Sequence, residues 1–308
     1  MVYKRRRGST VLRRVSISII SATKTNLYYL VRKVVITPSR RVFLAPEVMM
    51  SNRVIREFGP EFALRVIFRD DDFFRKLYST KTDDVTWFQS TIETPLKTGI
   101  RVGGRKYNFL GWSNSQLRDH GCYMYADIPA TVQRAAVTVN DIRDWMGDFS
   151  NLTSVSKLMA RMGQCFTQSR SVLKLDSSRV SVDQDIVLRN DKILQLDSEY
   201  LRQEPYYVFS DGIGQLSLGL AKQITQELGI HNLPPNAVPS AFQIRYGGSK
   251  GMIAVNPRLD ERPDKPQLRL RNSMKKFDSE STNLEVVKHS EPSKYDSYYS
   301  SLKDIINA

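Results

Sequence analysis

Two glycine-rich stretches contain the residue types that could contact a phosphate. In the first, VFSDGIGQLS at residues 208–217, an apolar strand leads into a glycine turn with one carboxylate, Asp211. A strand followed by glycines and a helix can present backbone N–H groups to a phosphate. The dinucleotide fingerprint, however, requires a third glycine where this chain has Ser217, and no Gly-Lys-Ser/Thr of a phosphate loop follows. We therefore expect Asp211, Gly212 and Gly214 to shape a structural turn.

The carboxylates of this chain do not group as metal ligands. Metal-dependent phosphoryl transfer needs several carboxylates around Mg²⁺, whereas Asp211 is alone in its turn. We expect Asp211 to accept hydrogen bonds from nearby backbone N–H groups, as aspartates in turns do. The run Asp70–Asp72 would alternate between opposite faces of an extended chain, which favours a solvated turn before a helix. Cys122 is close to His120, but no second cluster has ligand spacing, so the sequence predicts no metal site.

The second glycine-rich stretch, RYGGSKGMI at residues 245–253, places Lys250 between glycines in a predicted turn with strand-like flanks. Gly248 and Gly251 permit tight curvature and the close approach of a partner. The lysine adds a positive point charge that suits a phosphate. A further basic run, RLRNSMKKF, follows shortly afterwards. Turn and run together could form a path for a nucleic-acid backbone, and the alternative is an ordinary solvated surface. The candidate phosphate contacts here are Arg245, Lys250, Lys275 and Lys276.

Composition and charge favour a globular chain with a polyanionic partner. Of the 308 residues, 41% are hydrophobic and 25% charged, enough for a packed core in one large domain or two ordinary ones. The net charge is +14, and residues 1–41 supply +11 of it with eleven Lys/Arg and no acid. This basic surplus indicates an RNA or DNA partner, or a basic leader outside the folded body. Two cysteines cannot build a disulfide framework, and no stretch is long and apolar enough for a membrane span. We expect an intracellular protein, cytoplasmic or nuclear.

Hydrophobic periodicity predicts alternating strands and helices. In the first half, the patterns predict two strands around a Thr-Pro turn in residues 30–47, and a helix over 51–59 capped by Ser51 and ended by Gly59. A strand over 62–68 and further strands over 99–127 follow, the latter around a Gly-Gly turn. A short helix then begins near Asn140 as a possible cap. A longer helix over 153–169 is expected to bury the stripe Val155, Leu158, Met159, Met162 and Phe166.

The second half is predicted to contain one clear strand-turn-helix unit and one hairpin. Residues 171–197 are polar and weakly periodic, so we expect exposed connections with a strand or two. Residues 206–230 read as strand, glycine turn and helix, with Leu220, Ile224 and Leu228 on the apolar face and Gly229 as the stop. Residues 241–257 form a predicted hairpin around the Gly-Gly turn.

Taken together, the segments resemble a known family. TPSRRVFLAPE, SNRVIREFG, FLGWSNSQLRDHGCYMYA, DIRDWMGDFS, KLMARMGQCFTQS, FSDGIGQLS, YGGSKGMIAVNP and NSMKKF occur in the order found in the eukaryotic RNA-dependent RNA polymerases of RNA silencing. The resemblance covers about residues 30–291. Several of the motifs would be weak alone, but eight in order are specific for the family.

The resemblance implies an α+β fold in which a mixed helix/strand region precedes part of a double-psi β-barrel polymerase core. We expect a basic, disordered leader over residues 1–29, a helix/strand region beside the template channel over 30–203, the first barrel in part over 204–290, and a polar tail over 291–308. In the related cellular polymerases, the lysine matching Lys250 faces the nucleotide phosphates. Arg118, inside one of the matching segments, joins the implied phosphate contacts.

The implied reaction is template-directed RNA synthesis from ribonucleoside triphosphates, with Mg²⁺ held by an Asp-x-Asp-Gly-Asp loop of a second barrel. This sequence contains no such loop. We therefore expect the chain to hold no cofactor itself and to be inactive alone, while the complete enzyme would use Mg²⁺, an RNA template and silencing-complex proteins. Three hypotheses remain open: a polymerase whose second half lies beyond residue 308, a short RNA-binding scaffold or competitor, and a remnant that does not fold alone.

Overall fold

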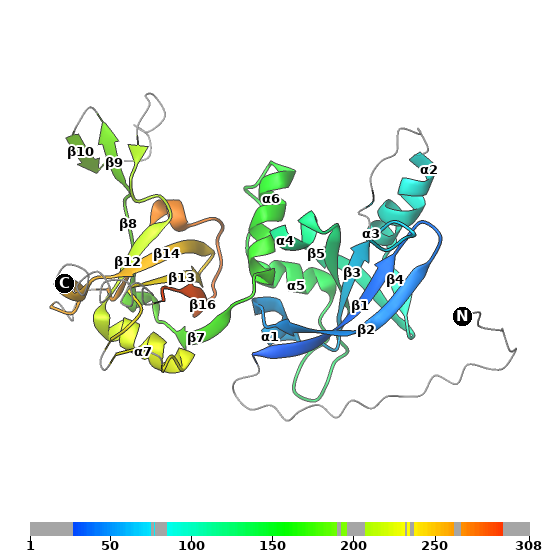
Figure 1. Ribbon diagram of the computed structural model, residues 1–308, viewed down its shortest axis with the longest axis horizontal. Coiled ribbons are helices and arrows are strands. Elements are labelled where there is room, and N and C mark those ends of the chain that lie inside the picture. The colour runs from blue at the N-terminus through cyan, green and yellow to red at the C-terminus, as the bar shows by residue number, and fades with distance from the viewer. Residues whose placement is uncertain are drawn as a thin grey trace, which may run out of the picture.

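The computed structural model describes residues 27–74, 77, 85–189, 192–195, 207–231, 233–234, 237–261 and 266–291. These residues form two bodies that lie side by side, each built on its own mixed sheet (Figure 1). Strands and helices alternate along the chain, as the sequence predicts. Most of the expected leader and tail, residues 1–26 and 292–308, lies outside the described residues.

The first body is built on a six-stranded sheet with the order β2-β1-β3-β6-β5-β4. β1 and β3 are parallel, and the other neighbouring strands are antiparallel. The predicted strand pair around the Thr-Pro turn is confirmed, because Thr37 N–H bonds to the Arg40 carbonyl between the two strands at 2.9 Å. The strands are β1 (Tyr28–Ile36), β2 (Arg41–Met50), β3 (Ala63–Phe68), β4 (Ile100–Val102), β5 (Arg105–Gly111) and β6 (Gly121–Ala126).

Helices cover both faces of this sheet. Apolar side chains of α1 and α5 pack on one face, and partly buried side chains near α3 pack on the other. Both faces of β3 and β6 are therefore buried. The helical segments are α1 (Arg53–Phe58), α2 (Val85–Phe88), a π turn (Gln89–Glu93), α3 (Thr94–Thr98), α4 (Asn114–Arg118), α5 (Val139–Met146) and α6 (Val155–Met162).

Two cap predictions in the first body are wrong, and one strand prediction is confirmed only in part. Asn52 caps α1, accepting from Ile55 N–H at 3.0 Å, while the Ser51 hydroxyl donates to the Ser169 carbonyl. Thr138 caps α5 in a capping box with Asp141, because the helix begins before Asn140. Residues 99–127 contain the predicted strands, with β4 and β5 paired around the Gly103–Gly104 turn, but α4, which begins at Asn114, lies between β5 and β6.

The expected core stripe of residues 155–166 is confirmed only in part, because Phe166 is buried and Met162 packs against the core, whereas Val155 is exposed. No residue of α6 is buried, and Val155 is 70% exposed. Burial begins only in the following 3₁₀ turn (Gly163–Phe166), where Cys165 and Phe166 join the core. The helix is only partly covered because α6 lies at the edge of the first body, on the side that faces the second body (Figure 1).

The second body is built on a seven-stranded sheet with the order β7-β16-β13-β14-β12-β15-β8. The β12–β14 and β15–β8 pairs are parallel, and the remaining pairs are antiparallel. Helix α7 (Leu218–Leu228) packs beside it, capped by Ser217 and ended by Gly229 in the left-handed conformation, which confirms the predicted stop. The strands are β7 (Arg170–Lys174), β8 (Val180–Asp183), β12 (Ile213–Leu216), β13 (Ala241–Tyr246), β14 (Ser249–Val255), β15 (Leu268–Arg271) and β16 (Asn283–His289).

A small ribbon projects from this sheet (Figure 1). It contains β9 (Ile186–Arg189), β10 (Lys192–Gln195) and β11 (Tyr207–Val208). Residues 171–197 thus contribute four strands rather than mainly exposed connections. Because β7 and β8 precede residue 204, the sheet extends across the sequence boundary expected between 203 and 204, and that boundary stays a prediction.

Phe277 joins the two bodies. It lies after β15, in the chain of the second body, yet its ring is buried in the apolar core of the first, 4.8 Å from the Phe149 ring. Beside it, Asp148 N–H bonds to the Asp278 carbonyl at 2.9 Å. Phe277 and its neighbours therefore contribute to fixing the relative position of the two sheets, together with contacts such as the Arg56–Glu285 ion pair.

We expect Phe277→Ala to lower the free energy of unfolding by about 3–5 kcal/mol, the range for deleting a buried aromatic ring. Phe209→Ala is the matched control, because Phe209 is 65% exposed and should change stability by less than about 0.5 kcal/mol. Urea unfolding followed by tryptophan fluorescence measures both. Equal effects of the two substitutions would contradict the role given to Phe277.

Candidate nucleic-acid interface

The candidate site begins with a row of charged residues across the second sheet. Lys250 on β14 stands opposite Arg245 on β13, and Arg245 stands opposite Glu285 on β16. Directly opposed residues of antiparallel strands share one face, so two cations and one acid are neighbours there. Lys250 was expected in a turn, but the turn is Gly247–Gly248, and Lys250 belongs to the strand that follows.

Glu285 connects this row to the first body. Its carboxylate is buried and pairs with Arg56 of α1 at 3.0 Å. The Ser169 hydroxyl donates to its second oxygen at 2.8 Å. Desolvation lowers the pKa of Arg245, and the negative charge of Glu285 opposes part of that shift. Because the Glu285 carboxylate already binds Arg56 and Ser169, it neutralises the positive charge of Arg245 and Lys250 only in part.

Lys250 lies among positive charges. Its pKa is lowered, first by burial and then by Arg245, Arg161 and Lys276. Arg161 belongs to α6, so both bodies contribute to this cationic cluster. Mutual repulsion of this kind is relieved when an anion such as a phosphate binds among the charges.

The cationic row opens into a cavity of about 530 Å³ between the two bodies, which we call the central cleft. The second sheet, strands β2, β3 and β6 of the first sheet, and the end of α6 all contribute to its wall. Among the lining residues are Met49, Arg65, Gln116, Tyr123, Gln164, Phe166, Arg245, Lys250 and Lys288. A cleft with several cations and few acids suits the backbone of a nucleic acid.

The other predicted phosphate contacts lie at different places. Lys276 is close enough to Lys250 to lower its pKa, and its own ammonium contacts the Ser273 carbonyl. Lys275 pairs with Asp278 at 2.5 Å, with both side chains at least half exposed. Arg118 is exposed at the end of α4 and is not among the residues that line the central cleft. The structure therefore brings Arg245, Lys250 and Lys276 together, and the phosphate contacts themselves stay a prediction.

Two of the predicted turn glycines are required by close packing. A Cβ on Gly251 would lie 2.2 Å from the Gly212 carbonyl oxygen. At Gly248, where φ is +77°, it would lie 1.9 Å from the Phe277 carbonyl oxygen. These glycines let the hairpin that carries Lys250 pack against the turn at residues 209–212 on one side and Phe277 on the other.

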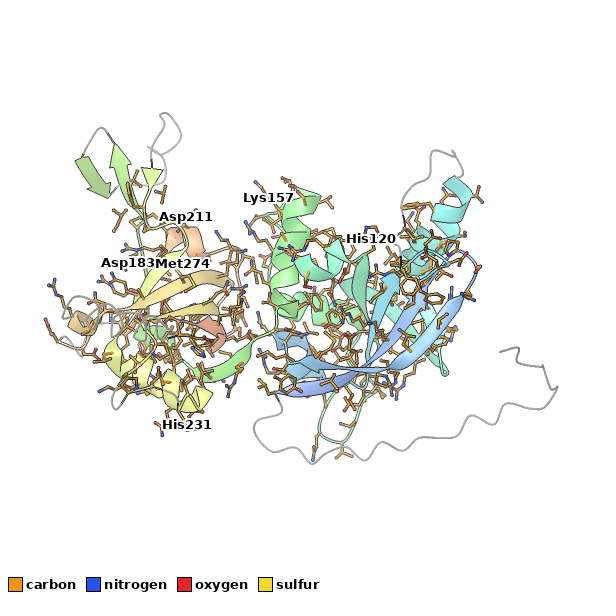
Figure 2. The ribbon with its side chains drawn as sticks, in the orientation of Figure 1. His120, Lys157, Asp183, Asp211, His231 and Met274 are labelled. Carbon is orange, nitrogen blue, oxygen red and sulfur yellow. The ribbon has the colours of Figure 1, made fainter. Side chains whose placement is uncertain are left out.

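A buried carboxylate that the sequence analysis missed holds the 209–212 turn. Asp185 accepts from the Ser210 and Ser273 hydroxyls at 2.8 and 2.7 Å, and from Ser273 N–H at 2.8 Å. The Ser273 hydroxyl also lies 3.0 Å from Gly212 N–H and accepts from it. Asp211 lies in the turn but is exposed, between ribbon and sheet (Figure 2), so the acceptor role expected of it falls to Asp185.

The described residues do not fit a magnesium site. They contain no group of three His, Cys, Asp or Glu side chains that could hold a metal ion. In the Asp70–Asp72 run, each carboxylate accepts from backbone N–H groups: Asp70 from Asp71, Asp71 from Ser39, and Asp72 from Phe74. Cys122 is buried in the first sheet, and burial raises its pKa to about 12, as for an inert core thiol.

The chain has a mixed α and β fold with a cationic cleft between its two bodies. Its structure is similar to that of the RNA-dependent RNA polymerase QDE-1 from Thielavia terrestris, with a TM-score of 0.65, 16% identity, and coverage of 87% of this chain and 29% of the other. Residues 36–296 match the family model described as RNA dependent RNA polymerase. The chain therefore belongs to the RNA-dependent RNA polymerase family.

Similar proteins from plants and yeast are also named RNA-dependent RNA polymerases. RNA-dependent RNA polymerase 1 of Arabidopsis thaliana is 38% identical over 269 residues, covering 85% of this chain and 22% of the relative. RNA-dependent RNA polymerase 2 of the same plant is 36% identical over 83% of this chain and 21% of its own length. RNA-dependent RNA polymerase 1 of Schizosaccharomyces pombe is 33% identical, covering 84% and 19%. The chain thus spans about a fifth of the length of these three relatives.

We expect Glu285→Gln to lower the free energy of unfolding by roughly 1–3 kcal/mol. The neutral amide leaves Arg56 without its acid, and the cost stays below that of a fully buried pair because the Arg56 side chain is 19% exposed. Asp278→Asn is the matched control, since its pair with Lys275 is solvated and worth at most about 1 kcal/mol. Chemical denaturation at pH 7 and low salt measures both. If Asp278→Asn lowered the free energy of unfolding as much as Glu285→Gln, the Arg56–Glu285 pair would not be the stabilising contact that we infer.

Proposed function

We propose that this chain acts in template-directed RNA synthesis, as part of the RNA- and nucleotide-binding core of an RNA-directed RNA polymerase. The observation that carries the proposal is the cationic row at the central cleft, set within a chain that belongs to this family. RNA template and ribonucleoside triphosphates are the proposed substrates, and silencing-complex proteins are the proposed partners by analogy with the family's role.

In this proposal Lys250 and Arg245 contact phosphate oxygens. The ammonium of Lys250 supplies a point charge, and the guanidinium of Arg245 supplies several donors in fixed geometry. Lys276 adds to the positive potential around Lys250. These side chains would bind and orient the phosphates of RNA or nucleotide while a 3′-hydroxyl attacks the α-phosphate and pyrophosphate leaves.

The double-psi barrel and the intracellular location remain parts of the proposal. Parallel pairing of β12 with β14 and of β15 with β8, inside an otherwise antiparallel sheet, supports a barrel-like core. No helix among the described residues has the length and apolarity that a membrane crossing requires.

We expect the magnesium ions of the reaction to be bound by carboxylates that are not among these 308 residues. The sequence has no Asp-x-Asp-Gly-Asp loop, and the described carboxylates do not fit a metal. When bound, such ions would stabilise the attacking and leaving oxygens. The described residues of this chain contribute phosphate binding and positioning, and no proton-transfer or metal-binding role is assigned to them.

RNA binding tests the phosphate contacts. We expect Lys250→Met to weaken binding of a labelled single-stranded RNA, and to reduce the slope of log K against log salt by about 0.7, the value for one lost contact to a single strand. Lys222→Met, an exposed lysine on α7, is the control and should leave the slope unchanged. Fluorescence anisotropy between about 50 and 200 mM salt measures both. Equal slopes for Lys250→Met and the unsubstituted chain would remove Lys250 from the interface.

A nucleotide-incorporation assay separates a complete catalyst from a binding part. We expect the 308-residue chain alone to add no labelled nucleotide to a primed or unprimed template in Mg²⁺, because its described residues offer no metal site. Salt-dependent RNA binding without incorporation fits the proposal. Template-dependent product in Mg²⁺ would show that the chain holds its own catalytic carboxylates.

A further inference from the structure

Ser273 connects three chain segments of the second body. Its hydroxyl donates to Asp185 Oδ1 at 2.7 Å and accepts from Gly212 N–H at 3.0 Å. Its backbone N–H donates to Asp185 Oδ2 at 2.8 Å, and its carbonyl accepts from the Lys276 ammonium. One serine therefore links the segment before β9, the 209–212 turn and the basic run that contains Lys276.

Asp185 completes this network from the base of the projecting ribbon. The residue is 9% exposed, and the Ser210 hydroxyl donates to its carboxylate at 2.8 Å. Ile186 N–H, at the start of β9, donates to the same Ser210 hydroxyl at 2.8 Å. A carboxylate forms stronger hydrogen bonds than a neutral acceptor does, so Asp185 holds its donors firmly.

From Ser273 the network reaches the strand that carries Lys250. Gly212, whose N–H bonds to Ser273, accepts from Met252 N–H through its carbonyl at 2.9 Å. Met252 and Lys250 are two residues apart on β14 and so lie on the same face of the strand. Gly251, between them, packs directly on the turn, since an added Cβ would lie 2.2 Å from the Gly212 carbonyl oxygen. The position of Lys250 is thus linked to the Ser273 hydroxyl through Gly212.

The same serine also reaches Lys276. The Ser273 carbonyl accepts from the Lys276 ammonium, and Lys276 N–H donates to the Gly248 carbonyl at 3.1 Å, in the turn before Lys250. The pKa of Lys250 is lowered by burial and further by nearby cations that include Lys276. Two neighbouring cations repel each other, so hydrogen bonds to the backbone around them are needed to keep them together.

We propose that Ser273 and Asp185 are positioning residues that hold Lys250 and Lys276 together beside the central cleft. Neither Ser273 nor Asp185 is among the residues that line the cleft, so both act through the backbone of Gly212 and through Lys276. The inference deepens the proposed function and rests on it, because the spacing of the two cations matters only where they bind phosphate.

The test is a double-mutant cycle in the full 308-residue chain, with binding of a labelled 12-nucleotide single-stranded RNA as the measurement. Ser273→Ala removes the hydroxyl shared by Asp185 and Gly212 but keeps the carbonyl that binds Lys276. We expect it to weaken RNA binding about 2- to 10-fold, the effect of one lost hydrogen bond. In the Lys250→Met background, the same substitution should change the affinity by less than about 2-fold, because no Lys250 remains to be positioned.

The pKa of Lys250 is a second measurement, and it needs no RNA. NMR of lysine side chains labelled with ¹³C at Cε gives this pKa, and the Lys250 signal is identified by its loss in Lys250→Met. We expect Ser273→Ala to raise the pKa of Lys250 toward its ordinary value, because the released lysine moves away from the burial and the cations that lower it. An unchanged pKa would overturn the inference.

Asp185 is tested by the same two measurements. Asp185→Asn replaces one carboxylate oxygen by an N–H donor, so the side chain loses an acceptor for the Ser210 and Ser273 donors. We expect RNA binding to weaken at least as much as in Ser273→Ala, because the backbone of Ser273 is released together with its hydroxyl. RNA affinity equal to that of the unsubstituted chain would overturn the part assigned to Asp185.

Two variants guard against trivial results. Ser273→Thr keeps the hydroxyl and should retain both the RNA affinity and the Lys250 pKa of the unsubstituted chain. Asp260→Asn is the matched control, because Asp260 accepts from Leu218 N–H at 2.7 Å and Gly219 N–H at 3.0 Å at the start of α7 rather than at Ser273. It should change neither measurement. Thermal unfolding shows whether each variant is folded.

The outcomes separate this inference from the proposed function. Equal weakening by Ser273→Ala with and without Lys250 would indicate a general loss of structure and would overturn the inference alone. RNA affinity that falls in Lys250→Met but not in Ser273→Ala would do the same. Absence of salt-dependent RNA binding would overturn the proposed function, and the pKa of Lys250 would then decide whether Ser273 positions this lysine.

Discussion

The insertion of Phe277 into the core of the first body is the contact on which the arrangement of the site depends. Phe277 lies beyond β15 in the second body, and the segment around it bonds to the Gly248 carbonyl and to the loop after α5. The buried pair of Glu285 with Arg56 fixes the same interface a few strands away. These contacts bring α6 and its 3₁₀ turn opposite β13 and β14, and so create the cleft between them.

The positive charges at that cleft repel one another in the folded chain. Arg245 and Lys250 are directly opposed on neighbouring strands, an arrangement that costs free energy when both are positive. Glu285 is already engaged by Arg56 and Ser169, and Arg161 and Lys276 add further positive charge. A bound phosphate would offset this repulsion. This row of positive charges is therefore consistent with the phosphate binding that we propose for a member of the RNA-dependent RNA polymerase family.

The glycine turn at residues 209–212 has a supporting role in this arrangement. Asp185, Ser210 and Ser273 tie the turn to the ribbon and to the segment after β15. Gly251 then lets β14 pass close to the turn, which keeps the strand carrying Lys250 in position. An exposed Asp211 takes no part in these bonds, so the conspicuous carboxylate of the motif is not the one that organises it.

The sequence by itself determined the local elements and the family. The hairpin around Gly247–Gly248, the helix from Ser217 to Gly229 and the strand pair around the Thr-Pro turn follow from short-range signals, because turn and cap residues act within a few positions. Only the tertiary structure decided how far a helix face is covered, as in α6, whose apolar stripe is only partly buried, and which polar side chains are buried, as in Asp185 and Gln164. Periodicity shows which residues share a face but not what packs against it. Partners that are far apart in sequence, such as Arg56 and Glu285, meet only when the whole chain has folded.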